Sequence, residues 1–194
     1  MAVDEMRQSF EPTLWTRTEG RDVKQVWFPG AHSDVGGGYR ETGLSDGALA
    51  WMVAEAEDKG MAVDPTVKAQ IRPDHLDRLH DSLGDVFKFL PSKPRGIPPL
   101  DAENGQSLHD SVVKRCKSPP ITQMPYRATK RLAVGASATI PVFAINPWNP
   151  TGLLLEAGAE YKCAAQGEWL VRHISCGPAG TKDGNFQPAE VVQV

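Results

Sequence analysis

The chain has 194 residues, with 21 Lys or Arg against 24 Asp or Glu, so its formal net charge at neutral pH is −3. This mild acidity excludes a general basic surface for DNA or RNA, and no apolar run approaches the roughly 20 residues that a membrane-spanning helix needs. Hydrophobic residues make up 40% of the chain, a share typical of a globular protein rather than a disordered acidic tail.

The first part of the chain has the pattern of a strand, a glycine-rich loop and a helix. A β-type segment at 23–28 is followed by a loop at 32–43 and by a predicted helix at 45–60, with Ser45 as a favourable N-cap. An apolar stripe on this helix is expected to pack against the strand; it consists of Leu49, Met52, Val53 and Ala56. This order of elements is typical of an α/β sheet protein.

Proline shapes the middle of the chain. Seven of the 16 prolines lie between Pro91 and Pro125, and because proline fixes φ and lacks an N–H donor, this stretch predicts extended connectors rather than continuous helix. One helix is expected to interrupt them, from Ser107 to about Cys116, with Ser107 as its cap.

Short apolar runs alternate with turns after Arg131, which indicates a small β-sandwich. The predicted strands are 138–145, 153–156, 159–165, 168–174 and 189–194. We therefore expect two domains, an α/β part at 1–128 and a β-rich part at 129–194. Since about 60 residues are marginal alone, the second part should dock on the first.

The most informative segment is Trp27–Tyr39, which reads WFPGAHSDVGGGY. It places His32 just beyond a predicted strand, where open α/β sheets build their sites, and histidine can accept and return a proton near neutrality. His32 is therefore the predicted catalytic residue, and the alternative is a structural histidine in a tight loop. Asp34 is predicted to support the site or fix the loop. Three glycines are expected to let the backbone approach a ligand or a neighbouring loop closely: Gly36, Gly37 and Gly38.

This segment resembles the histidine signature of the type VI secretion phospholipase effectors and their relatives. The likeness extends over about residues 2–128, with AVDEMR at 2–7 before the signature and the segment 44–56 after it. The resemblance implies the C-terminal portion of an α/β-hydrolase fold with a Ser-Asp-His triad, in which His32 is the triad histidine. It also implies glycerophospholipid substrates, no cofactor, and a cytoplasmic bacterial protein that a type VI system exports without a signal peptide.

The nucleophile of such an enzyme is missing from the sequence. The G-x-S-x-G elbow does not occur, and the nearest string, GASAT at 135–139, follows the histidine although the family order is serine, acid, histidine. Ser9 is the one serine before His32, and Asp4 and Glu5 are poor candidates for the acid. We therefore expect a truncated or split hydrolase that is inactive alone.

Three expectations about geometry and partners follow from that missing nucleophile. His32 should be exposed, with the positions of the serine and the acid vacant. The strand at 23–28 should have an open edge, which invites pairing with another chain. The expected partners are the upstream half of the hydrolase or a secretion-spike protein, and not nucleic acid.

The second interpretation is a non-enzymatic binding or structural module. The segments 148–153, 167–169 and 176–178 are similar to small galactose-binding lectins, in which Asp183 and Asn185 would be oxygen ligands for calcium. Two ligands are too few for calcium, so no metal site is predicted.

The remaining histidines and cysteines carry weaker signals. His80 and His109 each stand in a Leu-His-Asp-Ser string, which predicts helix-start caps. The three cysteines fit no zinc motif and are expected to be reduced, with a disulfide between Cys163 and Cys176 as the alternative.

Overall fold

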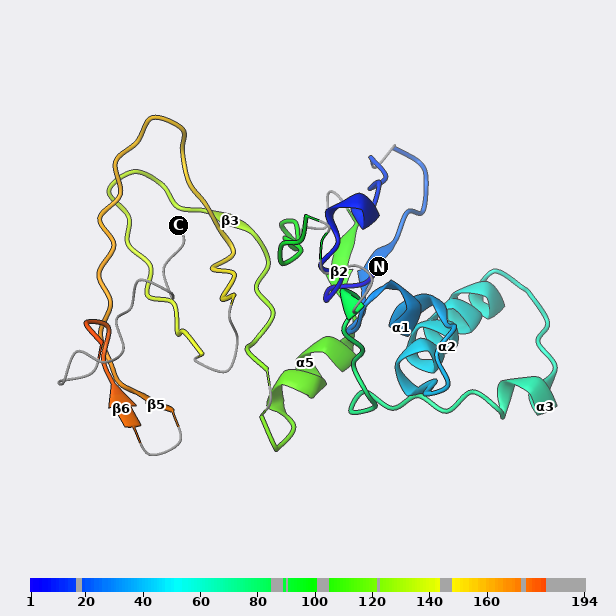
Figure 1. The fold of residues 1–194 in the computed structure, drawn as a ribbon. Coiled ribbons are helices and arrows are strands. Elements are labelled where there is room, and N and C mark those ends of the chain that lie inside the picture. The colour runs from blue at the N-terminus through cyan, green and yellow to red at the C-terminus, as the bar shows by residue number, and fades with distance from the viewer. Residues whose placement is uncertain are drawn as a thin grey trace.

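The structure is a computed structural model that describes residues 1–16, 19–84, 89, 91–100, 105–121, 123–143, 148–171 and 174–180. Its elements are short (Figure 1). In chain order they are η1 (Gln8–Phe10), β1 (Gln25–Trp27), α1 (His32–Gly36), α2 (Gly43–Asp58), α3 (Pro65–Lys68), β2 (Gln106–Leu108), α5 (Asp110–Lys117), β3 (Lys130–Arg131), β4 (Leu153–Leu154), β5 (Trp169–Val171) and β6 (Ile174–Cys176). The predicted ligands Asp183 and Asn185 and the predicted strand 189–194 lie outside the described residues.

Strand β1 lies in the middle of a small parallel layer. It pairs in parallel with β2, Val26 opposite Ser107. On its other side Phe28 donates its backbone N–H to the carbonyl of Met1 at 2.8 Å, and Val3 donates to the carbonyl of Phe28 at 3.0 Å. All three residues of β1 are buried, as expected for a parallel strand covered on both faces. The predicted strand is confirmed, but the predicted open edge is wrong for residues 26–28, where the first residues of the chain pair with it.

Side chains alternate between the two faces of this layer. Trp27 packs on one face in the core cluster with Val3 and Ile97, and its indole N–H donates to Gln106 Oε1 at 2.8 Å, which satisfies the buried donor. Phe28 points to the other face, where its ring stacks on His109 at 4.6 Å and meets Trp51 at 5.8 Å. The core therefore joins segments that are far apart in the sequence.

Helix α2 confirms the predicted helix but packs through a different face. It begins two residues earlier than expected, at Gly43, whose N–H is capped by the carboxylate of Asp77 at 2.8 Å. Leu44 is buried, whereas Leu49 is 48% exposed and Met52 57% exposed. The prediction of a tightly packed apolar stripe is therefore wrong for Leu49 and Met52, and the contact of the helix with the strand that the structure shows is that of Trp51 with Phe28.

The helix predicted from Ser107 begins later in the structure than expected. Ser107 belongs to β2, and helix α5 begins three residues later. The ring of His109 caps α5 by accepting the backbone N–H of Ser111 at 3.3 Å. The helix is confirmed and the string does lie at its start, but the cap is the ring of His109 rather than Asp110 or Ser111, and the predicted start at Ser107 is wrong.

The described residues of the C-terminal part contain two separate strand pairs. β3 and β4 pair in parallel, and β5 and β6 form an antiparallel hairpin within the predicted strand 168–174 and just beyond it. The described residues of the predicted strands 138–145 and 159–165 are not in strands, and none of the residues whose exposure is described after Lys130 is buried. Figure 1 shows this part set apart from α1 and α2 rather than docked on them.

Two further features bear on the expectations from the sequence. The three cysteines are free thiols. Among the helices that the structure describes, none has the length and apolarity needed to cross a bilayer.

Candidate catalytic site

The candidate site lies at the carboxyl end of the parallel layer. Glu5 follows the segment that pairs with one edge of β1, and His32 follows β1 itself. His109 follows β2 and donates its backbone N–H to the carbonyl of Trp27 at 2.9 Å. Open α/β sheets bind their ligands at this end of the strands, and here the layer brings Glu5 from a distant part of the chain to His32.

His32 begins a short helix, which differs from the predicted glycine-rich loop. Helix α1 covers His32–Gly36 and ends at Gly37 and Gly38, whose φ angles of 87° and 121° strongly favour glycine. A Cβ added at Gly36, Gly37 or Gly38 would meet nothing within 4 Å. The predicted close approach of a neighbouring loop is therefore wrong, and the last two glycines instead set the direction of the chain.

Glu5 orients the ring of His32. Its Oε2 lies 2.8 Å from His32 Nδ1 and 3.3 Å from the His32 backbone N–H, and its side chain is fully buried. The expectations that Glu5 is a poor acid candidate and that the acid position is vacant are both wrong. The segment AVDEMR is part of the resemblance, and its carboxylates are the signal that could have identified Glu5.

Arg7 holds Glu5 in a bidentate ion pair. Arg7 Nε lies 2.8 Å from Oε1 and Nη2 lies 2.9 Å from Oε2, with the Arg7 side chain 5% exposed. Burial by itself would raise the pKa of the Glu5 carboxyl, but hydrogen bonds from Arg7, His32 and Ser82 outweigh it and hold the pKa well below its usual range. Glu5 is thus ionised at neutral pH.

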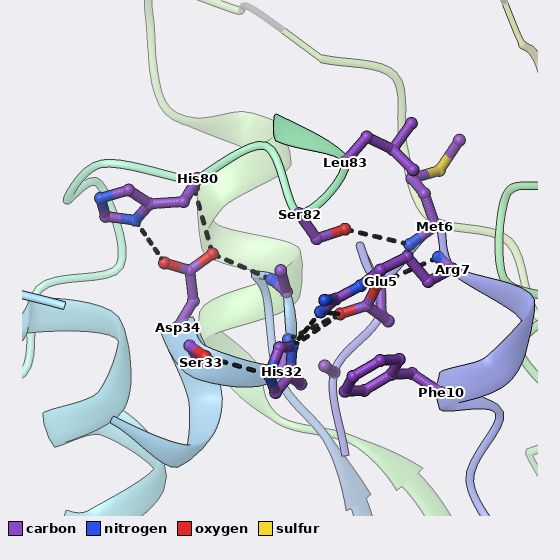
Figure 2. A network of polar contacts seen from close by, with 12 residues as sticks. Glu5, Met6, Arg7, Phe10, His32, Ser33, Asp34, His80, Ser82 and Leu83 are labelled. Atoms are coloured by element: carbon purple, nitrogen blue, oxygen red, sulfur yellow. Dashed lines mark hydrogen bonds and ion pairs between the residues drawn. The ribbon is translucent and has the colours of Figure 1, made fainter. Parts of the chain in front are cut away.

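The other side of the His32 ring is open. The side chain is 43% exposed, and Nε2 has the hydroxyl of Ser33 at 3.1 Å. Figure 2 shows Phe10 beside the ring; their centroids are 4.7 Å apart, and the Arg7 guanidinium lies 3.8 Å from the Phe10 centroid. The expected exposure is present, but the expectation that no serine lies within reach of Nε2 is wrong, because the Ser33 hydroxyl is there.

Asp34 and His80 form a second histidine–carboxylate pair. Asp34 Oδ1 lies 2.6 Å from His80 Nδ1, and Oδ2 accepts the backbone N–H groups of Ala31 at 2.9 Å and His80 at 3.1 Å (Figure 2). His80 also stacks on Tyr39 at 3.7 Å. Asp34 thus ties α1 to the segment around residue 80. In the string that contains His80, Asp81 accepts the backbone N–H of Leu83 at 2.9 Å, as the capping prediction expects, and residues 85–88 that would continue a helix lie outside the described residues.

The turn before α1 is held from both sides. Gly30 donates its N–H to Asp4 Oδ2 at 2.7 Å, and the same oxygen accepts the hydroxyl of Tyr126 at 2.6 Å. Burial raises the pKa of Asp4 despite these hydrogen bonds. A Cβ at Gly30 would lie 2.4 Å from the Cβ of Asp34, so this position requires glycine. These contacts therefore fix the backbone of the turn that precedes His32.

Two other features define what the site could hold. Among the residues that the structure describes, no group of three or more His, Cys, Asp or Glu has the arrangement of a metal site. A cavity of about 320 Å³ lies between α1 and α2, lined mainly by apolar side chains, among them Phe28, Val35, Leu49, Trp51 and Met52. The ring of His32 is not part of this lining.

A comparison with protein families concerns this part of the chain. Residues 1–55 match the family described as "T6SS, Phospholipase effector Tle1-like, catalytic domain". The match includes Glu5, Arg7, His32 and Asp34 and ends within α2. The match supports the resemblance to phospholipase effectors for these residues. It gives no support to the lectin-like resemblance of the C-terminal part.

One curated relative extends the comparison to a eukaryote. "Uncharacterized protein YEL023C" of Saccharomyces cerevisiae is 45% identical over 71 residues, which cover 34% of this chain and 10% of the yeast protein. The chain thus matches about a tenth of the length of that relative. No solved structure matches the chain.

Proposed function

We propose that this chain contributes a catalytic histidine and its orienting carboxylate to a serine hydrolase that cleaves ester bonds of glycerophospholipids. The observation that carries the proposal is the buried Glu5 carboxylate at 2.8 Å from Nδ1 of the exposed His32. Both residues lie within the segment that matches the Tle1-like catalytic domain. The parallel layer with its site at the carboxyl end supports the C-terminal portion of an α/β-hydrolase fold as part of this proposal.

Each residue has a defined task in this mechanism. His32 Nε2 takes the proton from the serine nucleophile and later returns it to the leaving group. Glu5 holds the ring through Nδ1 and stabilises the imidazolium that forms. The apolar cavity between α1 and α2 offers a place for an acyl chain of the lipid.

The nucleophilic serine in this proposal comes from outside these 194 residues, which contain no G-x-S-x-G elbow. In this proposal a polypeptide or segment with the elbow completes the site, and the Tle1-like match supports delivery by a type VI system. A second candidate rests on one distance: Ser33 Oγ lies 3.1 Å from Nε2, which would make Ser33, His32 and Glu5 a complete triad.

The experiment compares the chain alone with the completed site. The purified chain is assayed on phosphatidylcholine and phosphatidylglycerol vesicles and treated with a fluorophosphonate probe. It is then combined with a polypeptide carrying the G-x-S-x-G portion of a Tle1-like domain. We expect no turnover from the chain alone, since loss of a triad nucleophile typically costs on the order of a millionfold. The combination should show turnover and probe labelling at the elbow serine.

The variants separate the candidates. His32→Ala should abolish turnover of the combination, whereas His75→Ala, a histidine that contacts Ser118 instead of the site, should not. Turnover by the chain alone that Ser33→Ala abolishes, with probe attached to Ser33, would establish the second candidate. Turnover of the combination that survives His32→Ala would refute both.

A further inference from the structure

The 80–82 segment, His80 to Ser82, lies against both carboxylates of the site. His80 contacts Asp34, and Ser82 contacts the part of the chain that carries Glu5 (Figure 2). Both contacts come from beyond the residues that match the Tle1-like catalytic domain. The site therefore draws on a part of the chain that the family match does not cover.

Ser82 holds the Glu5 carboxylate and the backbone next to it. The residue is 7% exposed, so water is a poor partner for its hydroxyl. The hydroxyl oxygen accepts the backbone N–H of Met6 at 3.4 Å, which leaves its own proton to donate. Burial raises the pKa of the Glu5 carboxyl, and a hydrogen bond from Ser82 is one of those that lower it. A single hydroxyl thus fixes the carboxylate that faces His32.

His80 acts on the backbone that leads into His32. Asp34 Oδ1 lies 2.6 Å from His80 Nδ1, and Oδ2 accepts the backbone N–H groups of Ala31 at 2.9 Å and His80 at 3.1 Å. Asp34 is 2% exposed, so these contacts are its main partners in place of water. Because Ala31 directly precedes His32, the carboxylate that His80 holds also fixes the chain at the start of helix α1.

The 80–82 segment is anchored on elements outside the site. Arg115 of helix α5 donates from Nη1 to the carbonyl of Asp77 at 2.8 Å. The carboxylate of Asp77 in turn accepts the backbone N–H of Gly43, the first residue of helix α2, at 2.8 Å. The chain just before the segment is thus tied to two helices, which makes the segment a fixed support.

We infer that the 80–82 segment positions the proposed base from two sides. Ser82 acts on the ring through Glu5. His80 acts on the backbone through Asp34. Both are positioning residues, because each acts through a carboxylate. The consequence for catalysis rests on the proposed function: a base that is no longer held in its productive geometry reacts more slowly, although the substrate binds as before.

Exchange of backbone amide hydrogens in the full chain reports the two contacts separately. We would follow hydrogen–deuterium exchange of the ¹⁵N-labelled chain by NMR. The amide of His32 lies 3.3 Å from Glu5 Oε2 and reports the first contact, and the amide of Ala31 donates to Asp34 and reports the second. The amide of Gln25, on the opposite edge of β1, is the standard for an intact core.

Ser82→Ala removes the hydroxyl that holds Glu5. The His32 amide should then exchange about tenfold faster or more, the effect of losing a hydrogen bond to a charged group, while the Gln25 amide is unchanged. Ser82→Thr keeps the hydroxyl and should restore the wild-type rate. Ser118→Ala is the matched control, because it removes a serine hydroxyl that donates to a helix carbonyl instead, and it should leave all three amides unchanged.

His80→Phe keeps an aromatic ring but removes the contact of Nδ1 with Asp34. The Ala31 amide should exchange about tenfold faster in this variant, again with an unchanged Gln25 amide. An unaltered rate at His32 in Ser82→Ala, or at Ala31 in His80→Phe, would overturn the inference. Equal acceleration of all three amides would also overturn it, because it indicates a general loss of stability.

Turnover of the combination with the G-x-S-x-G polypeptide tests the two proposals separately. Ser82→Ala should lower kcat with little change in KM, and Ser82→Thr should restore kcat. A wild-type kcat in Ser82→Ala removes the role of the 80–82 segment and leaves His32 as the base. Absence of turnover, or turnover that survives His32→Ala, refutes the proposed function, and the exchange rates then still decide whether the segment positions His32.

Discussion

The buried ion pair between Glu5 and Arg7 should be the most costly single feature of the site to break. Glu5→Gln keeps the shape of the side chain but removes its charge, and the residue is 1% exposed. The Arg7 guanidinium, 5% exposed, then lacks its counter-ion. Breaking one partner of a buried pair costs about 3–5 kcal/mol, because the other charge stays buried without compensation. Arg7→Met should cost a similar amount for the converse reason.

The double variant Glu5→Gln/Arg7→Met distinguishes this reasoning from simple loss of contacts. If the two costs were additive, the double variant would lose roughly 6–10 kcal/mol, which is comparable with the whole stability of a domain, about 5–15 kcal/mol. We expect instead that the double variant loses less than the sum of the single variants by at least about 2 kcal/mol, since no uncompensated charge remains.

Urea unfolding followed by far-UV circular dichroism measures these free energies. The matched control is the surface pair between Lys24 and Glu55, whose side chains are 44% and 28% exposed. Its variants should have much smaller effects, because exposed ion pairs contribute little and are screened. Additive costs for Glu5→Gln and Arg7→Met, or a cost of Glu5→Gln no larger than that of Glu55→Gln, would refute the reasoning.

Two further predictions follow from the structure. The difference in the free energy of unfolding between wild type and Glu5→Gln should shrink as the pH falls from about 7 to about 3. The pKa of Glu5 is depressed in the folded protein, so its carboxylate stabilises the fold fully above the unfolded pKa of about 4.3. That contribution is lost as the pH falls toward the folded pKa. A difference in urea midpoint that stays constant with pH would contradict this. Leu44→Ala should cost about 2–5 kcal/mol, because Leu44 is buried. Leu49→Ala should cost only a fraction of that, because Leu49 is half exposed. Equal losses of thermal stability in the two variants would show that the apolar stripe with Leu49 is the packing face after all.

The sequence by itself determined the local elements and the place of His32. The apolar segment at 23–28, the glycines after it and the periodic pattern at 45–60 are short-range signals, since each element is specified by neighbours a few residues away. They predicted a strand, a loop and a helix; the structure contains the strand and the helix, whereas the first part of the loop forms helix α1. The match at residues 1–55 agrees with the resemblance drawn from the same segment.

Only the tertiary structure decided what surrounds His32. Glu5 and His32 are 27 positions apart, and Asp34 and His80 are 46 apart, so no local pattern links them. They meet because residues 1–3 pair with the far edge of β1 and because the chain returns after α3 to the side of α1. The packing face of helix α2 could not be predicted from its sequence either, because apolar residues lie on more than one side of the helix. The face with Trp51 is the one that contacts Phe28. Pairing and packing between distant segments depend on the whole fold, which is why the partners of the histidine could not be predicted from its neighbours.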